Sequence, residues 1–156
     1  MTMPRRTRSA AETRAVGESL ARELAPDGLL LVSGELGAGK TVLTQGIAAG
    51  LGIDANEVVS PTFTLIQEYG SQRDREQQTH GRGSRLIHVD LYRLAPDEVW
   101  ELGLDELFAG PGVKVVEWPE RLPFDPPGAR WIEIRPASEE DAREIVERSP
   151  SSRTAR

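Results

Sequence analysis

The segment GELGAGKT, residues 34–41, has the residue types and the spacing of a phosphate-binding loop. Gly34, Gly39, Lys40 and Thr41 fill the pattern G-x-x-x-x-G-K-[ST]. Glycines let the backbone curl so that its N–H groups point at phosphates, the lysine contacts the outer phosphates, and the threonine hydroxyl binds Mg²⁺. The pattern predicts a nucleotide site with bound Mg²⁺, against the alternative of a Gly-rich turn that binds nothing.

The sequence on either side of this loop supports the prediction. LLLVS, residues 29–33, is a short continuous apolar run, which is typical of a central parallel strand covered on both faces. TVLTQGIAAGLGI, residues 41–53, is expected to form a helix that ends near Gly50 or Gly52. A strand, the loop and a helix thus follow one another, and the N-terminus of the helix faces the expected phosphates.

Two carboxylates stand near the ends of two other predicted strands. Asp90 follows the aliphatic start of LIHVDLYRL, and Glu117 ends VKVVE. Burying a lone carboxylate is costly, and in phosphate-loop proteins an acid at the end of a neighbouring strand holds Mg²⁺. We predict that both acids converge on the metal. In the alternative, Asp90 caps the chain or pairs with Arg93, and both acids are ordinary surface residues.

The rest of the chain alternates helices with strands, which indicates one α/β domain. SAAETRAVGESLARELA opens with Ser9 and Glu12 in capping-box spacing and then places apolar residues on one helix face. Strands are expected in SPTFTLIQEY after Pro61, and over LIHVDLYR, VKVVEW and ARWIEIR. PDEVWELGLDELF is expected to form one helix or two short ones.

The chain divides into a folded domain and two terminal segments. Residues 1–8 are expected to form a disordered basic tail, residues 9–136 the phosphate-loop domain, and residues 137–156 a C-terminal helix or tail that is partly disordered. Within the domain, residues 70–85 are polar and have no periodicity, which predicts a long loop.

The composition argues against several classes of protein. Of 156 residues, 38% are hydrophobic and 28% charged, as in a globular protein. No apolar run is long enough for a membrane span or a signal peptide, so we expect a cytoplasmic protein with no membrane partner. Cysteine is absent, which excludes disulfides and thiolate metal sites. The net charge of −6 makes a poor surface for binding nucleic acid without a partner.

Five short segments follow one another along the chain: GELGAGKT, SPTFTL, HVDLYRL, LGLDELF and VEWPERL. In this order they resemble the TsaE (YjeE) family, the small ATPases of bacterial tRNA threonylcarbamoyladenosine biosynthesis. The resemblance runs from about Ser9 to Arg135 and implies a P-loop NTPase-like, three-layer α/β sandwich with a mixed, largely parallel central sheet. The polar loop 70–85 departs from it, because many members have a shorter turn there.

The resemblance also implies ATP and Mg²⁺ as ligands and slow hydrolysis of ATP. The protein would dock on a complex of TsaD and TsaB, and its ATP cycle would reset that complex between turnovers. TsaD, rather than this protein, would transfer the threonylcarbamoyl group to adenosine 37 of tRNA. The tRNA would therefore be contacted only indirectly, through the complex.

The functional positions of that family fall on particular residues of this chain. The Mg²⁺ ligands would be Thr41, Asp90 and Glu117. Thr62 would lie near the γ-phosphate in a switch-like segment, and it joins Lys40 and the three metal ligands in the implied catalytic set. The nucleotide would contact Thr13 of the first helix and the loop residues Glu35, Leu36, Gly37, Ala38, Gly39, Lys40 and Thr41.

Three of these positions also have ordinary structural interpretations. Thr62 suits a strand because it is β-branched, with no role as a switch. Trp118 could stack or pack at a partner face, or it could belong to the core. His88 alternates with aliphatic residues, which fits a structural histidine better than a ligand.

Two other functions are compatible with the phosphate loop. A small-molecule kinase could use the arginines of the polar loop as a lid over phosphates: Arg73, Arg75, Arg82 and Arg85. A nucleotide-dependent binding module without turnover is the second, because no general base stands out and Arg93 is the sole candidate arginine finger. A GTPase is disfavoured, since the chain has no Asn-Lys-x-Asp segment to read guanine.

Overall fold

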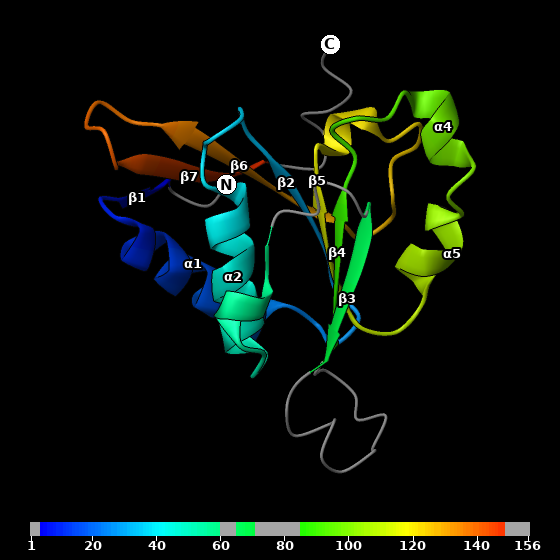
Figure 1. The fold of residues 1–156 in the computed structure, drawn as a ribbon, viewed down its shortest axis with the longest axis horizontal. Coiled ribbons are helices and arrows are strands. Elements are labelled where there is room, and N and C mark those ends of the chain that lie inside the picture. Colours follow the sequence, from blue (N-terminus) through cyan, green and yellow to red (C-terminus); the bar gives the residue numbers. More distant parts are fainter. Residues whose placement is uncertain (1–3, 60–64, 71–84, 149–156) are drawn as a thin grey trace.

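The computed structural model describes residues 4–59, 65–70 and 85–148, and these residues form a layered α/β structure (Figure 1). One sheet contains seven strands in this part of the chain, in the order β1-β7-β6-β2-β5-β4-β3. The strands are β1 (Arg5–Thr7), β2 (Leu29–Ser33), β3 (Ile66–Gly70), β4 (Arg85–Asp90), β5 (Val113–Glu117), β6 (Arg130–Pro136) and β7 (Arg143–Arg148).

The centre of the sheet is parallel and its edges are antiparallel. Strand β2 lies between β5 and β6 and is parallel to both, and β4 is parallel to β5. Antiparallel pairs complete the two sides, with β3 on β4, β7 on β6 and β1 on β7. The predicted mixed, largely parallel sheet is therefore confirmed.

Helices cover both faces of this sheet. They are α1 (Ala10–Glu23), α2 (Lys40–Gly50), α4 (Pro96–Trp100) and α5 (Leu104–Ala109), with 3-10 turns η1 (Ala55–Glu57) and η2 (Pro119–Arg121). Leu30 and Val32 of β2 pack in one hydrophobic core with α1 and α2, while Leu29 and Leu31 pack in a second core with α4 and α5. Both faces of β2 are buried, which explains its uninterrupted apolar sequence and gives the three predicted layers.

Helix α1 begins where its capping residues predict. Ser9 is the N-cap, and its side chain accepts a hydrogen bond of 3.1 Å from the backbone N–H of Glu12. The Glu12 carboxylate in turn accepts from the backbone N–H of Arg8, one residue before the N-cap. PDEVWELGLDELF forms two short helices, α4 and α5, which Gly103 separates with a left-handed φ of 67°.

Helices α1 and α2 pack so closely that two glycines are required between them. A Cβ atom on Gly17 would lie 2.4 Å from the carbonyl oxygen of Leu43, and one on Gly46 would lie 2.1 Å from that of Arg14. The backbones therefore touch with no side chain between them. This contact fixes the position of α2, which follows the phosphate loop.

The two terminal segments differ from their predicted form. Residues 5–7 form strand β1 rather than a disordered tail, and residues 143–148 form strand β7 rather than a helix or tail. Both are short, and their hydrogen-bond partners lie far away in sequence: Arg5 pairs in register with Ile145. Local sequence patterns do not indicate such long-range pairing. The predictions of a disordered N-terminal tail and of a C-terminal helix or tail are therefore wrong for these residues.

Some predictions concern residues that the structure does not describe. Residues 1–3, 60–64, 71–84 and 149–156 lie outside the described part of the chain. These ranges include the start of the strand expected after Pro61, most of the polar loop and the end of the C-terminal segment. Among the described residues, no helix has both the length and the apolar character needed to cross a membrane.

Candidate nucleotide-binding site

The phosphate loop joins the end of β2 to the start of α2, as its sequence predicts. Gly37 and Gly39 adopt left-handed φ values of 77° and 105°, which glycine reaches without steric cost. A Cβ atom on Gly34 would lie 2.7 Å from the carbonyl oxygen of Ile134, so the backbone passes too close to β6 for a side chain. No side chain caps α2 at Gly39, and its first N–H groups can therefore serve an anion.

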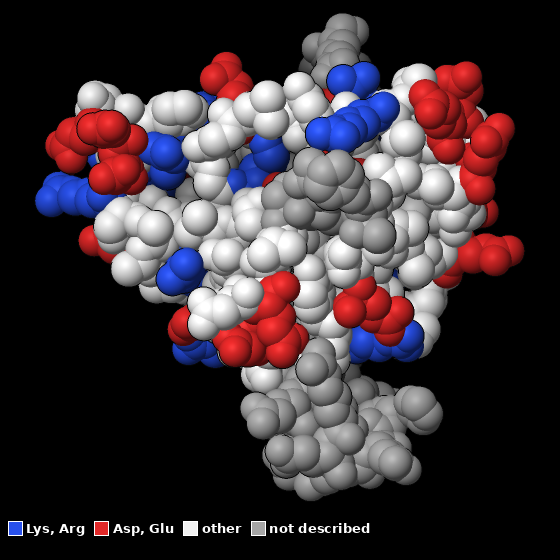
Figure 2. Space-filling model, viewed as in Figure 1, with Lys and Arg blue, Asp and Glu red and all other residues white. Residues whose placement is uncertain are grey.

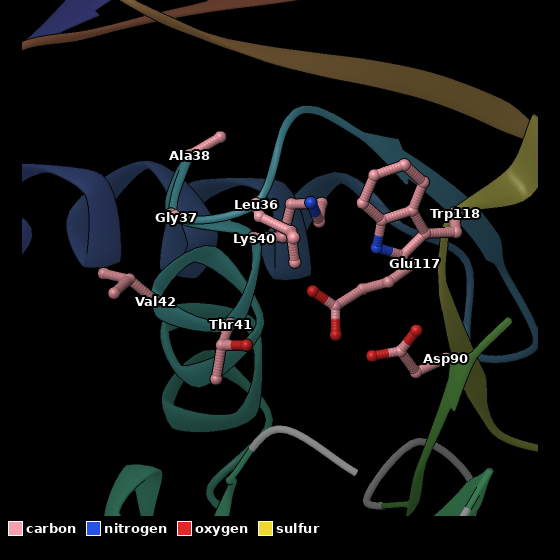
Figure 3. Close-up of a pocket in the computed structure, with 10 residues that line it drawn as sticks. Leu36, Gly37, Ala38, Lys40, Thr41, Val42, Asp90, Glu117 and Trp118 are labelled. Atoms are coloured by element: carbon pink, nitrogen blue, oxygen red, sulfur yellow. The ribbon is translucent and has the colours of Figure 1, made fainter. Parts of the chain in front are cut away.

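A pocket of about 290 Å³ opens beside this loop (Figure 3). Its walls come from the loop, from the start of α2 and from the ends of β4 and β5. It is lined by Leu36, Gly37, Ala38, Gly39, Lys40, Thr41, Val42, Asp90, Glu117 and Trp118. The structure thus brings most of the predicted site residues together around one cavity.

Lys40 lies between the loop and the acidic wall of the pocket. Its ammonium group donates hydrogen bonds to the carbonyl oxygens of Gly34 (2.5 Å) and Glu35 (2.9 Å). Burial lowers the pKa of Lys40, while the charges of Glu117 and Asp90 act in the opposite direction. Lys40 thus binds carbonyl oxygens of its own loop. The outer phosphates of a nucleotide would compete with these carbonyls for the ammonium group.

Asp90 and Glu117 are neighbours at the ends of parallel strands. The two residues pair in register between β4 and β5, and Figure 3 shows their carboxylates side by side across the pocket from Thr41. Burial raises the pKa of Asp90, and the charge of Glu117 raises it further, against the backbone N–H of Tyr92 that donates to Asp90 Oδ1 at 2.9 Å. The charge of Glu117 therefore disfavours the ionised form of Asp90, and a bound cation would relieve this repulsion.

The available donors suit Mg²⁺ completed by phosphates and water. Within the described ranges, no group of three or more histidine, cysteine or acidic residues is placed to hold a metal by itself. Among the described residues that line the pocket, Asp90, Glu117 and Thr41 have side-chain oxygen atoms that could bind a metal. Mg²⁺ is usually held in this way, by one or two carboxylates together with substrate phosphates and water.

His88 holds the Glu117 carboxylate from inside the sheet. Its Nε2 lies 2.6 Å from Glu117 Oε2, the distance of a hydrogen bond donated by the imidazole, and both side chains are buried. His88 Nδ1 is buried without a hydrogen-bond partner among the described residues. The prediction that His88 is structural misses this contact, because only the pairing of β4 with β5 brings the two residues together.

Trp118 forms the wall of the pocket beside Lys40. It adopts a left-handed backbone (φ 59°, ψ 50°), and among the described residues it is the one non-glycine with positive φ. Lys40 Nζ lies 4.4 Å from the centre of the Trp118 ring, within range of a cation–π contact. The centres of the Trp118 and Tyr92 rings are 4.8 Å apart. The uncommon backbone conformation turns the indole to the site.

Three of the predicted positions that the structure describes, Thr13, Glu35 and Arg93, do not line the pocket. Thr13 is buried in α1, where its hydroxyl lies 2.8 Å from that of Thr7, and it does not line the cavity. Glu35 meets Lys40 through its backbone oxygen alone. Thr62 lies outside the described residues. Arg93 is exposed, and no ion pair joins it to Asp90.

The structure also adds residues that the sequence analysis missed. Val42 lines the pocket directly after the Gly-Lys-Thr segment. Arg143 of β7 donates from Nε to the carbonyl oxygen of Ala38 at 2.8 Å and from Nη2 to that of Gly37 at 3.3 Å. No local motif marks Arg143, since it lies more than 100 residues from the loop and in the segment predicted to be a helix or tail.

Of the four arginines considered for a kinase lid, Arg85 is described. It forms an ion pair with Glu68 at the start of β4, at the opposite end of that strand from Asp90. The other three, Arg73, Arg75 and Arg82, lie outside the described residues.

A mixed α/β sheet with a parallel centre, and with this loop between its central strand and α2, defines the class of P-loop NTPase-type proteins. Within that class, the family model for "Threonylcarbamoyl adenosine biosynthesis protein TsaE" matches residues 7–145. The chain therefore belongs to the TsaE family, as its motifs suggested.

Individual relatives agree with this assignment. The chain is 40% identical over 141 residues to the tRNA threonylcarbamoyladenosine biosynthesis protein TsaE of Bacillus subtilis, covering 90% of this chain and 82% of that one. It is 44% identical over 118 residues to the protein of the same name from a Nostoc species, covering 73% and 66%. The crystal structure of Bacillus subtilis YdiB superposes with a TM-score of 0.65 at 36% identity, over 92% of this chain and 82% of that chain.

Proposed function

We propose that this protein binds ATP with Mg²⁺, hydrolyses it slowly, and uses this cycle to reset a TsaD–TsaB complex during tRNA threonylcarbamoyladenosine formation. One observation carries the proposal: the phosphate loop and two strand-end carboxylates, Asp90 and Glu117, meet around a single pocket. TsaE membership supplies the pathway.

The residues of the pocket divide the work between phosphate and metal. The backbone N–H groups of residues 37–41 would bind the phosphates, and Lys40 would exchange its bonds to Gly34 and Glu35 for the outer phosphate oxygens. Thr41, Asp90 and Glu117 would hold Mg²⁺, which neutralises the charge that develops on the phosphates during hydrolysis.

Slow turnover agrees with the groups that are present. The two pocket carboxylates are candidates both for the metal and for orienting water, and the hydrogen bond from His88 fixes Glu117 in one orientation. Among the residues that the structure describes, no other acid or histidine lines the pocket. We expect Thr62 to sense the γ-phosphate, which would link hydrolysis to the shape of a partner surface.

Docking on TsaD–TsaB is supported by apolar side chains at the mouth of the pocket. Leu36 is 67% exposed on the phosphate loop, and Tyr92 is 39% exposed where it contacts Trp118. A partner seated there would cover these side chains and sense the nucleotide directly. We expect this assembly to form in the cytoplasm, with tRNA held by the partners.

One assay separates this function from its two alternatives. ATP hydrolysis is measured for the protein alone and with purified TsaD and TsaB, with Lys40→Ala and Thr41→Ala as inactive references. Stimulation by the partners supports the proposal. Phosphoryl transfer to a small acceptor would identify a kinase, and tight ATP binding with no hydrolysis in any mixture would identify a binding module.

A further inference from the structure

Arg143 connects the C-terminal strand to the outside of the phosphate loop. Besides its bonds to Ala38 and Gly37, its Nη1 donates to the carbonyl oxygens of Glu140 (2.9 Å) and Ala142 (2.8 Å). All three nitrogens of the guanidinium are thus engaged by backbone carbonyls. Two of these carbonyls belong to the turn before β7 and two to the loop, so the side chain ties the two segments together.

The carbonyls that Arg143 holds are those that must point away from a nucleotide. A phosphate loop binds its ligand with N–H groups directed inward, which turns the intervening carbonyls outward. Ala38 is buried in the core, but the described residues leave open space beside the glycines on either side of it. A Cβ atom placed on Gly37 would have no neighbour within 4 Å, and for one on Gly39 the nearest atom would be Arg143 Nε at 3.9 Å.

Two cations therefore hold the loop, Lys40, which lines the pocket, and Arg143, which does not. Lys40 binds the carbonyls of Gly34 and Glu35, and Arg143 binds those of Gly37 and Ala38. If Lys40 moves to the phosphates, as the proposed function requires, Arg143 becomes the remaining described side chain that binds carbonyl oxygens of residues 34–39.

The strand that carries Arg143 is itself firmly placed. Arg143 pairs in register with Thr7 of β1 on one side and with Pro136 of β6 on the other. The hydroxyl of Thr7 lies 2.8 Å from that of Thr13 in α1, and both are buried. The guanidinium is therefore fixed to the sheet and, through β1, to the helix that packs on α2.

We propose that Arg143 is a positioning residue of the nucleotide site, and that it holds the phosphate loop in the form that binds ATP. This inference rests on the proposed function, which gives ATP as the ligand. The planar fork is the important property, because a single ammonium cannot bridge two successive loop carbonyls and two carbonyls of the turn at once.

The test compares ATP affinity, by titration calorimetry, in wild type, Arg143→Ala and Arg143→Lys. Loss of the loop contacts should weaken binding by about tenfold in Arg143→Ala. Arg143→Lys should recover only part of that loss. Arg135→Ala is the matched control, because Arg135 is exposed on the neighbouring strand β6 and pairs with Glu133 instead of the loop; its affinity should equal that of wild type.

A second readout separates loop positioning from general stability. Methylguanidinium at low millimolar concentration should restore ATP affinity to Arg143→Ala, while methylammonium at the same concentration should not. Should Arg143→Ala fail to fold, Arg143→Gln takes its place in both measurements.

The outcomes distinguish this inference from the proposed function. If wild type does not bind ATP, the proposed function fails. If wild type binds and the Arg143 variants bind within twofold of it, the inference is overturned. Equal losses in the alanine and lysine variants, with a lowered melting temperature and no rescue, would also overturn it, since they indicate a purely structural residue.

Discussion

Asp90 lies where its negative charge is disfavoured in the folded protein. Its pKa is raised by burial and by the neighbouring Glu117. A raised pKa in an acid means that the folded state disfavours the charged form relative to the unfolded chain. Such a penalty is typical of sites that bind a cation and uncommon at positions chosen for stability alone.

The first prediction concerns Asp90→Asn. The variant should be at least as stable as wild type without nucleotide, because the repulsion from Glu117 is removed. Its ATP hydrolysis should fall by at least about tenfold and require more Mg²⁺. Chemical unfolding and a Mg²⁺ titration of hydrolysis measure the two effects. Asp97→Asn, on exposed α4, is the control, and an unchanged Mg²⁺ requirement in Asp90→Asn would contradict the metal role.

The second prediction concerns the hydrogen bond from His88 to Glu117. His88→Ala leaves a buried carboxylate without its donor, which should lower the free energy of unfolding by about 1–3 kcal/mol and slow ATP hydrolysis more than it weakens ATP binding. His88→Gln keeps a donor and should recover part of both losses. Denaturant unfolding and single-turnover hydrolysis provide the measurements. Equal rates of ATP hydrolysis in wild type and His88→Ala would show that the hydrogen bond from His88 does not position Glu117 for hydrolysis.

At the scale of elements, what could be predicted depends on whether the signal is local. The turn from β2 into α2 consists of consecutive residues, so Gly39, Lys40 and Thr41 could be assigned to a phosphate loop from their spacing alone. Asp90 and Glu117 needed one further rule, that parallel strands end at the same edge of a sheet. The register of β4 and β5, which pairs these two acids directly, agrees with that rule.

Nonlocal pairing explains what was missed. Strand β1 has three residues, and β7 has two adjacent apolar residues, Ile145 and Val146, between charged ones, so neither stands out from a charged terminal segment. Arg143 reaches Ala38 across 105 positions of sequence. Only the completed sheet brings β7 to the phosphate loop. No local pattern in a single sequence predicts that contact.

The third prediction tests how the β6–β7 hairpin is held. Hydrogen bonds from Arg135 and Arg148 lower the pKa of Glu133, so the ionised carboxylate stabilises the fold. This contribution is fully present above the ordinary pKa of 4.5 and is lost as the pH falls through the lower folded value. Glu133→Gln should therefore cost about 0.5–1 kcal/mol near neutral pH.

The pH dependence provides the check on that hairpin. Urea unfolding of Glu133→Gln and wild type, compared from neutral pH to below pH 4, should show a difference that shrinks as the pH falls. Glu139→Gln, in the turn between β6 and β7, should match wild type throughout. A difference for Glu133→Gln that is constant with pH would mean that packing, rather than charge, is responsible.

At the scale of the whole molecule, acidic residues outnumber basic ones, and the net charge is −6. Figure 2 shows acidic side chains gathered over α4 and α5, where Asp97, Glu98, Asp105 and Glu106 occupy the first turns of two short helices. Basic residues of the hairpin are largely neutralised, since Arg130 pairs with Glu147 and Glu23. The charge of this described part of the hairpin is therefore partly neutralised and less available for binding phosphates.

The last prediction follows from this balance. The isolated protein should bind tRNA no more tightly than nonspecific proteins do, with a dissociation constant above about 10⁻⁶ M at physiological salt, because few phosphates can be neutralised. Fluorescence anisotropy with labelled tRNA measures this, with the TsaD–TsaB complex as the positive reference. ATP should not raise the affinity of the isolated protein, since the triphosphate adds negative charge at the pocket. Tight binding with a steep salt dependence would show that this chain contacts the tRNA itself, and would replace indirect contact through partners with direct recognition.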